Sequence, residues 1–193
     1  MIERVDSDEI VIHNRGVFRR LFENFFSHSS HGGLLPPNIS EVKVAGVDCK
    51  LYRSGRVSKG HAEGLHKLGV QKVISFYNDG NSNDAQELRS ELSRKGIQNE
   101  IIVCPCQKMN IELVRNVIYS LLAEEKVQLL NCHAGADRTG LVIAALRRMQ
   151  GESTLSITAD LLRHTHVPWK KFWYFYREIL PEFQPQKSSK MPA

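Results

Sequence analysis

The sequence lacks a long apolar segment and an apolar leader. No run among its 193 residues approaches the roughly 20 apolar residues that a membrane-spanning helix requires. The first residues carry several charged side chains, among them Glu3, Arg4 and Asp6, where a secretory signal would be apolar. We therefore expect no transmembrane segment and no secretory signal.

Cysteine is also scarce. The four cysteines show neither the spacing of a disulfide framework nor that of a zinc ribbon, which favours a reducing, cytoplasmic location: Cys49, Cys104, Cys106 and Cys132. Four histidines have no supporting cluster of cysteines or acids: His28, His31, His164 and His166. We therefore expect neither a metal nor another cofactor.

Positively and negatively charged residues are nearly balanced in number. Its 26 Lys and Arg residues against 21 Asp and Glu residues give a net charge of +5, a modest excess that favours anionic partners. The sequence has no pronounced Lys/Arg run and no interleaving of basic with aromatic residues near the motif described below. Nucleic acid is therefore not expected as a partner, and we expect a monomer.

Length and patterning predict one domain with short ends. Residues 41–183 form the predicted domain, because short apolar runs alternate with helical patterns there. Residues 1–40 are an expected appendage with a phenylalanine-rich stripe, and residues 184–193 are an expected disordered tail. A chain of this length buries a core without disulfides or metals.

The predicted elements alternate between strands and helices. Strands are expected at residues 42–47, 50–53, 72–76, 100–104 and 127–131. Helices are expected after N-caps at Ser58, Asn83 and Asn110, over the apolar residues 140–150, from Ser153 and from Pro168. This alternation predicts an α/β fold with a mostly parallel central sheet flanked by helices.

The segment from Cys132 to Gly140 is the most informative part of the chain, and it reads Cys-His-Ala-Gly-Ala-Asp-Arg-Thr-Gly. It joins a predicted strand to a predicted buried helix. Such a junction aims backbone N–H groups and the positive end of a helix dipole at one point, which favours an anion. A thiol at that point is expected to ionise readily and to attack phosphorus. The glycine and the threonine make the pattern far more specific than its Cys-x5-Arg spacing alone.

With these residues the segment resembles the signature loop of the cysteine-dependent protein-tyrosine and dual-specificity phosphatase superfamily. Its extended form is similar to small bacterial-type and atypical dual-specificity members. Two upstream segments, Leu51 to Gly55 and Leu65 to Ser75, also resemble that group. The resemblance covers Val42 to Leu180 and is specific at the loop. It implies hydrolysis of phosphate monoesters through a phosphocysteine intermediate, without a metal.

The resemblance assigns a role to each loop residue. Cys132 would attack the phosphorus, Arg138 would bind two phosphoryl oxygens through its planar fork, and Thr139 would ease departure of the sulfur. The remaining oxygens would be bound by the backbone N–H groups of the loop: His133, Ala134, Gly135, Ala136, Asp137 and Arg138. Arg53 is expected to brace the loop or the sheet edge, with direct substrate contact as the alternative. Asn131 stands where the family usually has histidine.

The pattern leaves the general acid open. Most relatives take an aspartate from a loop upstream of the cysteine, but no aspartate lies between Ile101 and Asn131. Asp137 is the leading candidate, because myotubularin-type lipid phosphatases have aspartate at the matching position. Glu112 and the more distant Asp79 and Asp84 are the alternatives, whereas Glu124 and Glu125 are interpreted as a solvated surface pair.

The substrate also stays open at this point. The compact length, without an element that resembles a phosphotyrosine-recognition segment, predicts a dual-specificity-like enzyme acting on proteins phosphorylated on tyrosine, serine or threonine. The alternatives are a phosphoinositide or inositol-phosphate phosphatase and a catalytically weak, phosphate-binding pseudophosphatase.

Overall fold

A computed structural model describes residues 34–43, 50–105, 109–164 and 174–184 of the chain. These residues fall within one compact unit. Most of the expected appendage, the residues from Pro168 to Trp173 and the tail from residue 185 onward lie outside the described residues.

The described part is built on a five-stranded sheet with the order β1-β2-β5-β3-β4. Its strands are β1 (Ser40–Val42), β2 (Leu51–Ser54), β3 (Lys72–Tyr77), β4 (Gln98–Val103) and β5 (Gln128–Asn131). Strand β1 is antiparallel to β2, and the other neighbouring strands are parallel. The predicted α/β fold with a mostly parallel sheet is confirmed, and β5 lies at its centre.

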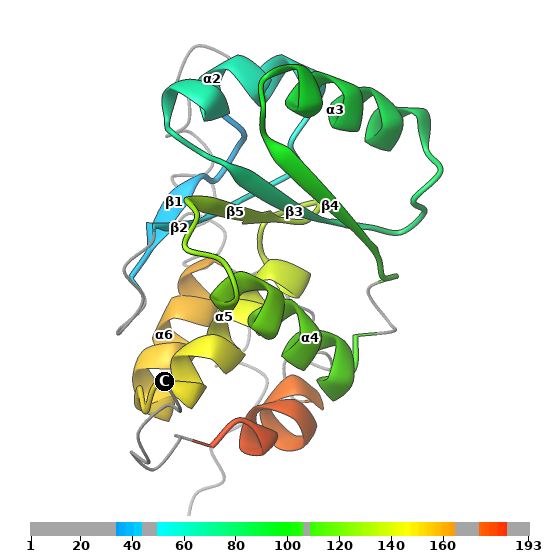
Figure 1. Ribbon diagram of the computed structural model, residues 1–193. Helices are drawn as coiled ribbons and strands as arrows, with labels where there is room; N and C mark the ends of the chain where they lie inside the picture. The colour runs from blue at the N-terminus through cyan, green and yellow to red at the C-terminus, as the bar shows by residue number, and fades with distance from the viewer. Residues whose placement is uncertain (1–33, 44–49, 106–108, 165–173, 185–193) are drawn as a thin grey trace, which may run out of the picture. The chain divides into compact units, whose positions relative to one another are not determined.

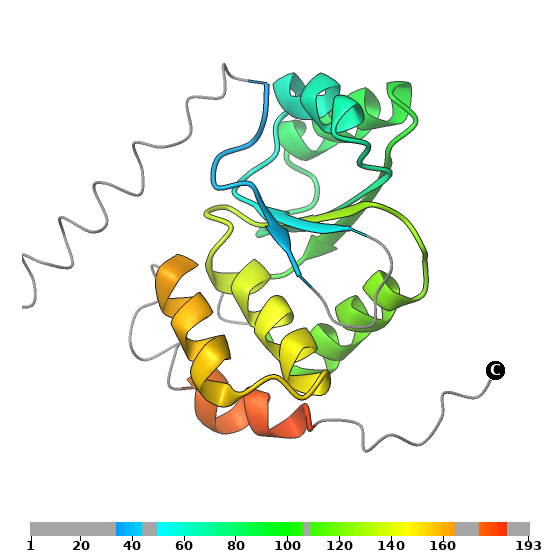
Figure 2. The ribbon, with the colours of Figure 1, turned by 90° about the vertical axis from the view of Figure 1, so that its left-hand side faces the viewer.

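Helices cover both faces of this sheet. Figure 1 shows α2 and α3 on one face and α4, α5 and α6 on the other, and Figure 2 shows the same layers after a quarter turn. The bounds are η1 (Lys59–His61), α2 (Ala62–Lys67), α3 (Asn83–Arg94), α4 (Ile111–Leu122), α5 (Asp137–Met149), α6 (Thr154–His164), η3 (Phe175–Ile179) and η4 (Leu180–Glu182). Within the described ranges, none of the helices is long and apolar enough to span a membrane.

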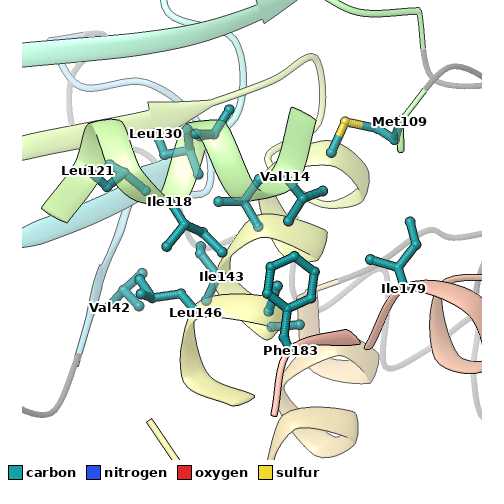
Figure 3. Packing of buried hydrophobic residues seen from close by; sticks show 14 of the residues in the cluster. Val42, Met109, Val114, Ile118, Leu121, Leu130, Ile143, Leu146, Ile179 and Phe183 are labelled. Atoms are coloured by element: carbon teal, nitrogen blue, oxygen red, sulfur yellow. The ribbon is translucent and has the colours of Figure 1, made fainter. Parts of the chain in front are cut away.

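Two apolar clusters hold these layers together. Consecutive side chains of a strand point to opposite faces, so Leu129 and Leu130 of β5 belong to different clusters. Leu129 belongs to a cluster with residues of α2 and α3, whereas Leu130 belongs to a cluster with Ile118 of α4 and Ile143 of α5 (Figure 3). The central strand is therefore buried on both sides, as expected for a parallel sheet.

Several element boundaries differ from the sequence prediction. Helix α5 begins at Asp137, three residues before the predicted start at Gly140, because its first turn continues directly from the loop. Asn110 caps α4 as predicted, since its side-chain Oδ1 accepts a hydrogen bond from the N–H of Leu113 at 2.8 Å. Helix α3 begins at Asn83 itself, with Ser82 at the N-cap position.

Candidate active site

Cys132 directly follows the central strand β5, whose neighbours in the sheet are β2 and β3. The loop from Cys132 to Ala136 leads from the strand into the N-terminus of α5. The Cys132 side chain is buried and its thiol is free. The candidate nucleophile therefore lies at the carboxyl edge of the sheet, where the ends of three parallel strands meet.

Gly135 allows the loop to lie against the end of β2. Its φ of +71° falls in the left-handed region that L-residues with a side chain rarely adopt. A Cβ atom there would lie 2.5 Å from the carbonyl carbon and oxygen of Ser54. Glycine is therefore required both by the backbone conformation and by the close approach.

Three successive carbonyl groups of the loop accept hydrogen bonds from the surrounding protein. The backbone N–H of Arg56 donates to the carbonyl of His133 at 3.2 Å, and Asn38 Nδ2 donates to that of Ala134 at 3.3 Å. Arg53 Nη2 donates to the carbonyl of Gly135 at 2.8 Å. The prediction that Arg53 braces the loop is confirmed, and Asn38, which the sequence assigned to the appendage, also contacts it.

Because these three carbonyl groups point outward, the N–H groups that follow them point to the opposite side of the loop. In a trans peptide the C=O of one residue and the N–H of the next point in opposite directions. None of the backbone N–H groups from His133 to Arg138 donates to an acceptor among the described residues. Together with the α5 N-terminus, these N–H groups are a set of donors that suits an anion.

Arg138 lies in the first turn of α5 and is buried. Its Nη1 donates to the carbonyl of Cys104 at 2.8 Å and to Oδ1 of Asn78 at 3.1 Å. Its Nε is buried and has no partner in the described part of the chain, and the same holds for Thr139 Oγ1. One edge of the guanidinium is thus anchored, while Nε and the Thr139 hydroxyl have no acceptor among the described residues.

Arg53 is buried in an ion-pair network behind the loop. Its Nη1 pairs with Oδ2 of Asp160 in α6 at 3.2 Å, and Arg147 of α5 lies 3.4 Å from the same oxygen. Burial lowers the pKa of Arg53 below its ordinary value, and the attraction of the Asp160 carboxylate offsets only part of this effect. This network ties α6 to the loop.

Asn131 does not bond the loop through its amide group. Its Nδ2 donates to Oγ of Ser75 at 2.8 Å and to the carbonyl of Ile74 at 3.2 Å, both in β3. The residue at the family's usual histidine position therefore ties β5 to β3 beneath the loop.

The candidate general acids lie in different environments. Asp137 is in the first turn of α5, and its Oδ1 is buried without a partner among the described residues. Glu112 is exposed in the first turn of α4. Asp79 accepts a hydrogen bond from the N–H of Asn81, and Asp84 lies 4.0 Å from Arg56. Asp137 is therefore the candidate that the structure places directly beside Arg138.

The interpretation of Glu124 and Glu125 as a solvated surface pair holds for Glu125, which is exposed, but is wrong for Glu124. Its Oε1 accepts a hydrogen bond from the buried Nζ of Lys72 at 2.8 Å. Lys72 is separated from Glu124 by most of the chain between β3 and β5, so a local sequence pattern does not show their contact.

Sequence reasoning also missed Asn78 and Arg56. Both follow the carboxyl ends of the strands that flank β5, and Tyr77 ends β3. Polar residues just after such strands are a signal for a ligand site in open α/β sheets. That signal becomes specific only once the strand order is known.

The model of a family described as "Tyrosine phosphatase family" matches residues 34–188. The chain belongs to this family. The match spans most of the chain and includes every element of the sheet. The prediction of a cysteine-dependent phosphatase is thereby confirmed at the level of the tyrosine phosphatase family.

Individual relatives of this family member are more distant. OCA1 of Scheffersomyces stipitis is 26% identical over 149 residues, which cover 68% of each chain. The core catalytic domain of the PP-IP phosphatase Siw14 from S. cerevisiae, in complex with citrate, has a TM-score of 0.60 at 18% identity and covers 75% of this chain and 87% of that one. P. aeruginosa TpbA in complex with pTyr has a TM-score of 0.57 at 17% identity, with coverage of 81% and 96%. At these identities the two structures show a shared fold.

Proposed function

We propose that this protein hydrolyses phosphate monoesters through a phosphocysteine intermediate on Cys132. The observation that carries the proposal is the donor set around the buried thiol. Loop N–H groups and Arg138 Nε lack protein acceptors among the described residues, and the segment that leads from Cys132 into the first turn of α5 carries them. A tetrahedral phosphoryl group supplies the acceptors that these donors lack.

In the first step, the thiolate sulfur of Cys132 attacks phosphorus and the bond to the ester oxygen breaks. The loop N–H groups and Arg138 bind the three non-bridging oxygens as their charge is redistributed. Asp137 donates its proton to the leaving oxygen, which departs as an alcohol or phenol. In the second step, water attacks the phosphocysteine and gives a proton to Asp137. The sulfur then departs as a thiolate, stabilised by a hydrogen bond from the Thr139 hydroxyl.

The proposed role of Asp137 rests on its position. It precedes Arg138 directly, and its buried Oδ1 has no partner in the described part of the chain. A carboxyl group that held a structural role there would be expected to have a hydrogen-bond partner. Glu112 lies on an exposed surface of α4 and remains the alternative acid.

We propose proteins phosphorylated on tyrosine, serine or threonine as the substrates. The family description and the fold shared with the TpbA complex support this choice. An inositol phosphate or phosphoinositide is the second candidate, and the shared fold with the PP-IP phosphatase Siw14 supports it. A pseudophosphatase that binds phosphate without turnover is the third, since no acid from an upstream loop is identified.

A comparison of wild type with Cys132→Ser tests the mechanism. The variant should lose all measurable turnover on phosphopeptides, phosphoinositides and inositol phosphates, yet still bind vanadate, because its donors remain. Chelators should not inhibit the wild type. Turnover that survives in Cys132→Ser would overturn the mechanism, whereas a wild type that binds vanadate but hydrolyses nothing would support the pseudophosphatase alternative.

A further inference from the structure

Arg56 lies beside the phosphate-binding loop and its side chain is not used by the proposed mechanism. Its backbone N–H donates to the carbonyl of His133, the residue after Cys132. Its guanidinium carbon lies 5.6 Å from the centroid of the Tyr77 ring, a cation–π contact that fixes the side chain without using its N–H groups. The backbone of Arg56 is therefore bound to the loop that carries Cys132, and its guanidinium is held against Tyr77.

Arg56 approaches the edge of the sheet from the side opposite Arg138. Tyr77 is the last residue of β3, and Asn78 follows it. Phe76 belongs to the apolar cluster of α4 and α5, so its strand neighbour Tyr77 points to the opposite face of the sheet. Tyr77 holds the guanidinium of Arg56 toward α3, while Asn78 accepts a hydrogen bond from Arg138 of α5. The two cations thus flank the carboxyl end of β5, which carries Cys132.

The side-chain hydrogen bonding of Arg56 differs from that of Arg53, which has a structural role. Arg53 is buried and donates hydrogen bonds at 2.8 and 3.2 Å to two acceptors. The side chain of Arg56 is 42% exposed and makes no hydrogen bond among the described residues. Its one carboxylate neighbour, Asp84, lies 4.0 Å away and is itself 75% exposed. The N–H groups of Arg56 are therefore accessible to a ligand.

We propose that Arg56 forms a second anion-binding subsite beside the phosphate-binding loop. The preferred substrates then carry a second anionic group next to the scissile phosphate. This inference rests on the proposed function, because the loop must hold the first phosphate. A planar guanidinium suits a phosphate or a carboxylate, so the second anion is either another phosphate or an acidic side chain of a phosphopeptide.

Binding to the Cys132→Ser protein tests the subsite without turnover. The probes are inorganic pyrophosphate, which places a second phosphate beside the first, and inorganic phosphate, which does not. Arg56→Gln should weaken pyrophosphate binding about tenfold, the value of one charge-assisted hydrogen-bonding group, and weaken phosphate binding much less. The matched control is Arg94→Gln, which removes an equal charge from the far end of α3 and should change neither affinity.

Substitutions of Asp84 and Tyr77 should change the affinity for pyrophosphate in opposite directions. Asp84→Asn removes the carboxylate that competes with the ligand for Arg56, so pyrophosphate should bind more tightly by a few-fold. Tyr77→Leu removes the ring that holds the guanidinium and should weaken pyrophosphate binding, whereas Tyr77→Phe keeps the ring and should resemble the parent. A purely structural role for Arg56 predicts no gain in Asp84→Asn.

Turnover by the Cys132-containing enzyme then identifies the source of the second anion. One pair of substrates is a phosphotyrosine peptide with Glu or with Gln beside the phosphotyrosine, and the other is an inositol bisphosphate or monophosphate. Arg56→Gln should abolish the preference for the doubly anionic member of one pair, through KM more than through kcat.

The proposal is overturned if Arg56→Gln changes pyrophosphate binding no more than Arg94→Gln does, or if it weakens phosphate binding by the same factor as pyrophosphate binding. Failure of the proposed function would instead appear as absent turnover in the wild type with the binding preference intact.

Discussion

Two groups of buried polar side chains, around Lys72 at the amino end of the central sheet and around Arg138 at its carboxyl end, differ in their hydrogen bonding. At the amino end, Lys72 of β3 is buried and its Nζ lies 2.8 Å from Glu124, 2.9 Å from Ser120 Oγ and 3.2 Å from Glu100. At the carboxyl end, Arg138 Nε and Thr139 Oγ1 are buried without partners among the described residues. Buried polar groups are normally satisfied by hydrogen bonds. The Lys72 cluster is satisfied within the protein, whereas the groups of Arg138 and Thr139 are those that we propose to bind a ligand.

The contacts between Lys72 and Glu124 at the amino end also shift the pKa values of both groups. Hydrogen bonds from Lys126 and Lys72 lower the pKa of Glu124 to about 2. Burial would lower the pKa of Lys72, but its hydrogen bonds to Glu124 and Glu100 outweigh burial and raise it. Each group therefore stays charged because its neighbours hold the opposite charge.

The largest effect at the carboxyl end is expected for Arg138→Lys. Lysine keeps the charge but cannot replace the planar guanidinium, whose Nη1 donates to Asn78 and to the carbonyl of Cys104. Because donors to the developing charge act mainly in the transition state, kcat should fall by about 10²- to 10³-fold. Steady-state kinetics measures this loss, and Arg94→Lys on the exposed end of α3 is the control. Near-normal kinetics in Arg138→Lys would place the phosphate elsewhere.

The next largest effect is expected for Asp137→Asn. If Asp137 protonates the leaving oxygen, hydrolysis of alkyl and phenyl phosphates should slow by about 10²-fold. Activated aryl phosphates should lose far less in the first step, since their leaving groups depart without a proton. Equal losses on both substrate types would show that Asp137 only shapes the loop. A selective loss in Glu112→Gln would move the acid to α4.

At the amino end, Lys72→Met should change stability and leave catalysis intact. The substitution keeps the length of the side chain but leaves the Glu100 and Glu124 carboxylates without their shared cation. Removing one partner of such a buried group is expected to lower the free energy of unfolding by about 2 kcal/mol. Denaturant unfolding measures the change, and Lys126→Met, whose side chain is 39% exposed, should cost less. A large loss of kcat at native stability would contradict the separation of the two ends.

The smallest expected effect is in the acid dependence of stability. Because the pKa of Glu124 is lower in the folded protein than in the unfolded chain, its contribution is complete above about pH 4.5 and is lost as the pH falls toward 2. Glu124→Gln cannot titrate at that position. Its free energy of unfolding should therefore decline less steeply than that of the wild type over this window. Parallel declines would contradict the pairing with Lys72 and Lys126.

Local patterns predicted much of the fold, whereas long-range contacts did not follow from them. Four of the strand runs, the Asn110 cap and the loop from Cys132 are encoded in short segments and appear within two residues of the predicted positions. The run predicted at residues 42–47 differs, because β1 is Ser40–Val42 and residues 44–49 lie outside the described residues. By contrast, Arg138 and Asn78 are 60 residues apart, and Lys72 and Glu124 are 52 apart. Their contacts depend on the strand order, which a single sequence does not specify. The wrong interpretation of Glu124 has this cause.

The difference between local and long-range contacts also applies to the candidate active site. The loop residues lie within one strand–loop–helix junction, so spacing alone indicates that they act together. Arg56 and Tyr77 meet only because β5 lies between β2 and β3. The residues that we propose to carry out the chemistry were therefore predictable, while the residues proposed to select the substrate were not.

The most direct test of the central claim is to trap the covalent intermediate. Wild-type protein is mixed with an activated aryl phosphate, quenched with acid within the first turnover and digested for mass spectrometry. We predict one phosphoryl group on the peptide that contains Cys132, and none on the same peptide from Cys132→Ser. Turnover without this adduct, or an adduct on a different residue, would contradict the assignment of Cys132 as the nucleophile.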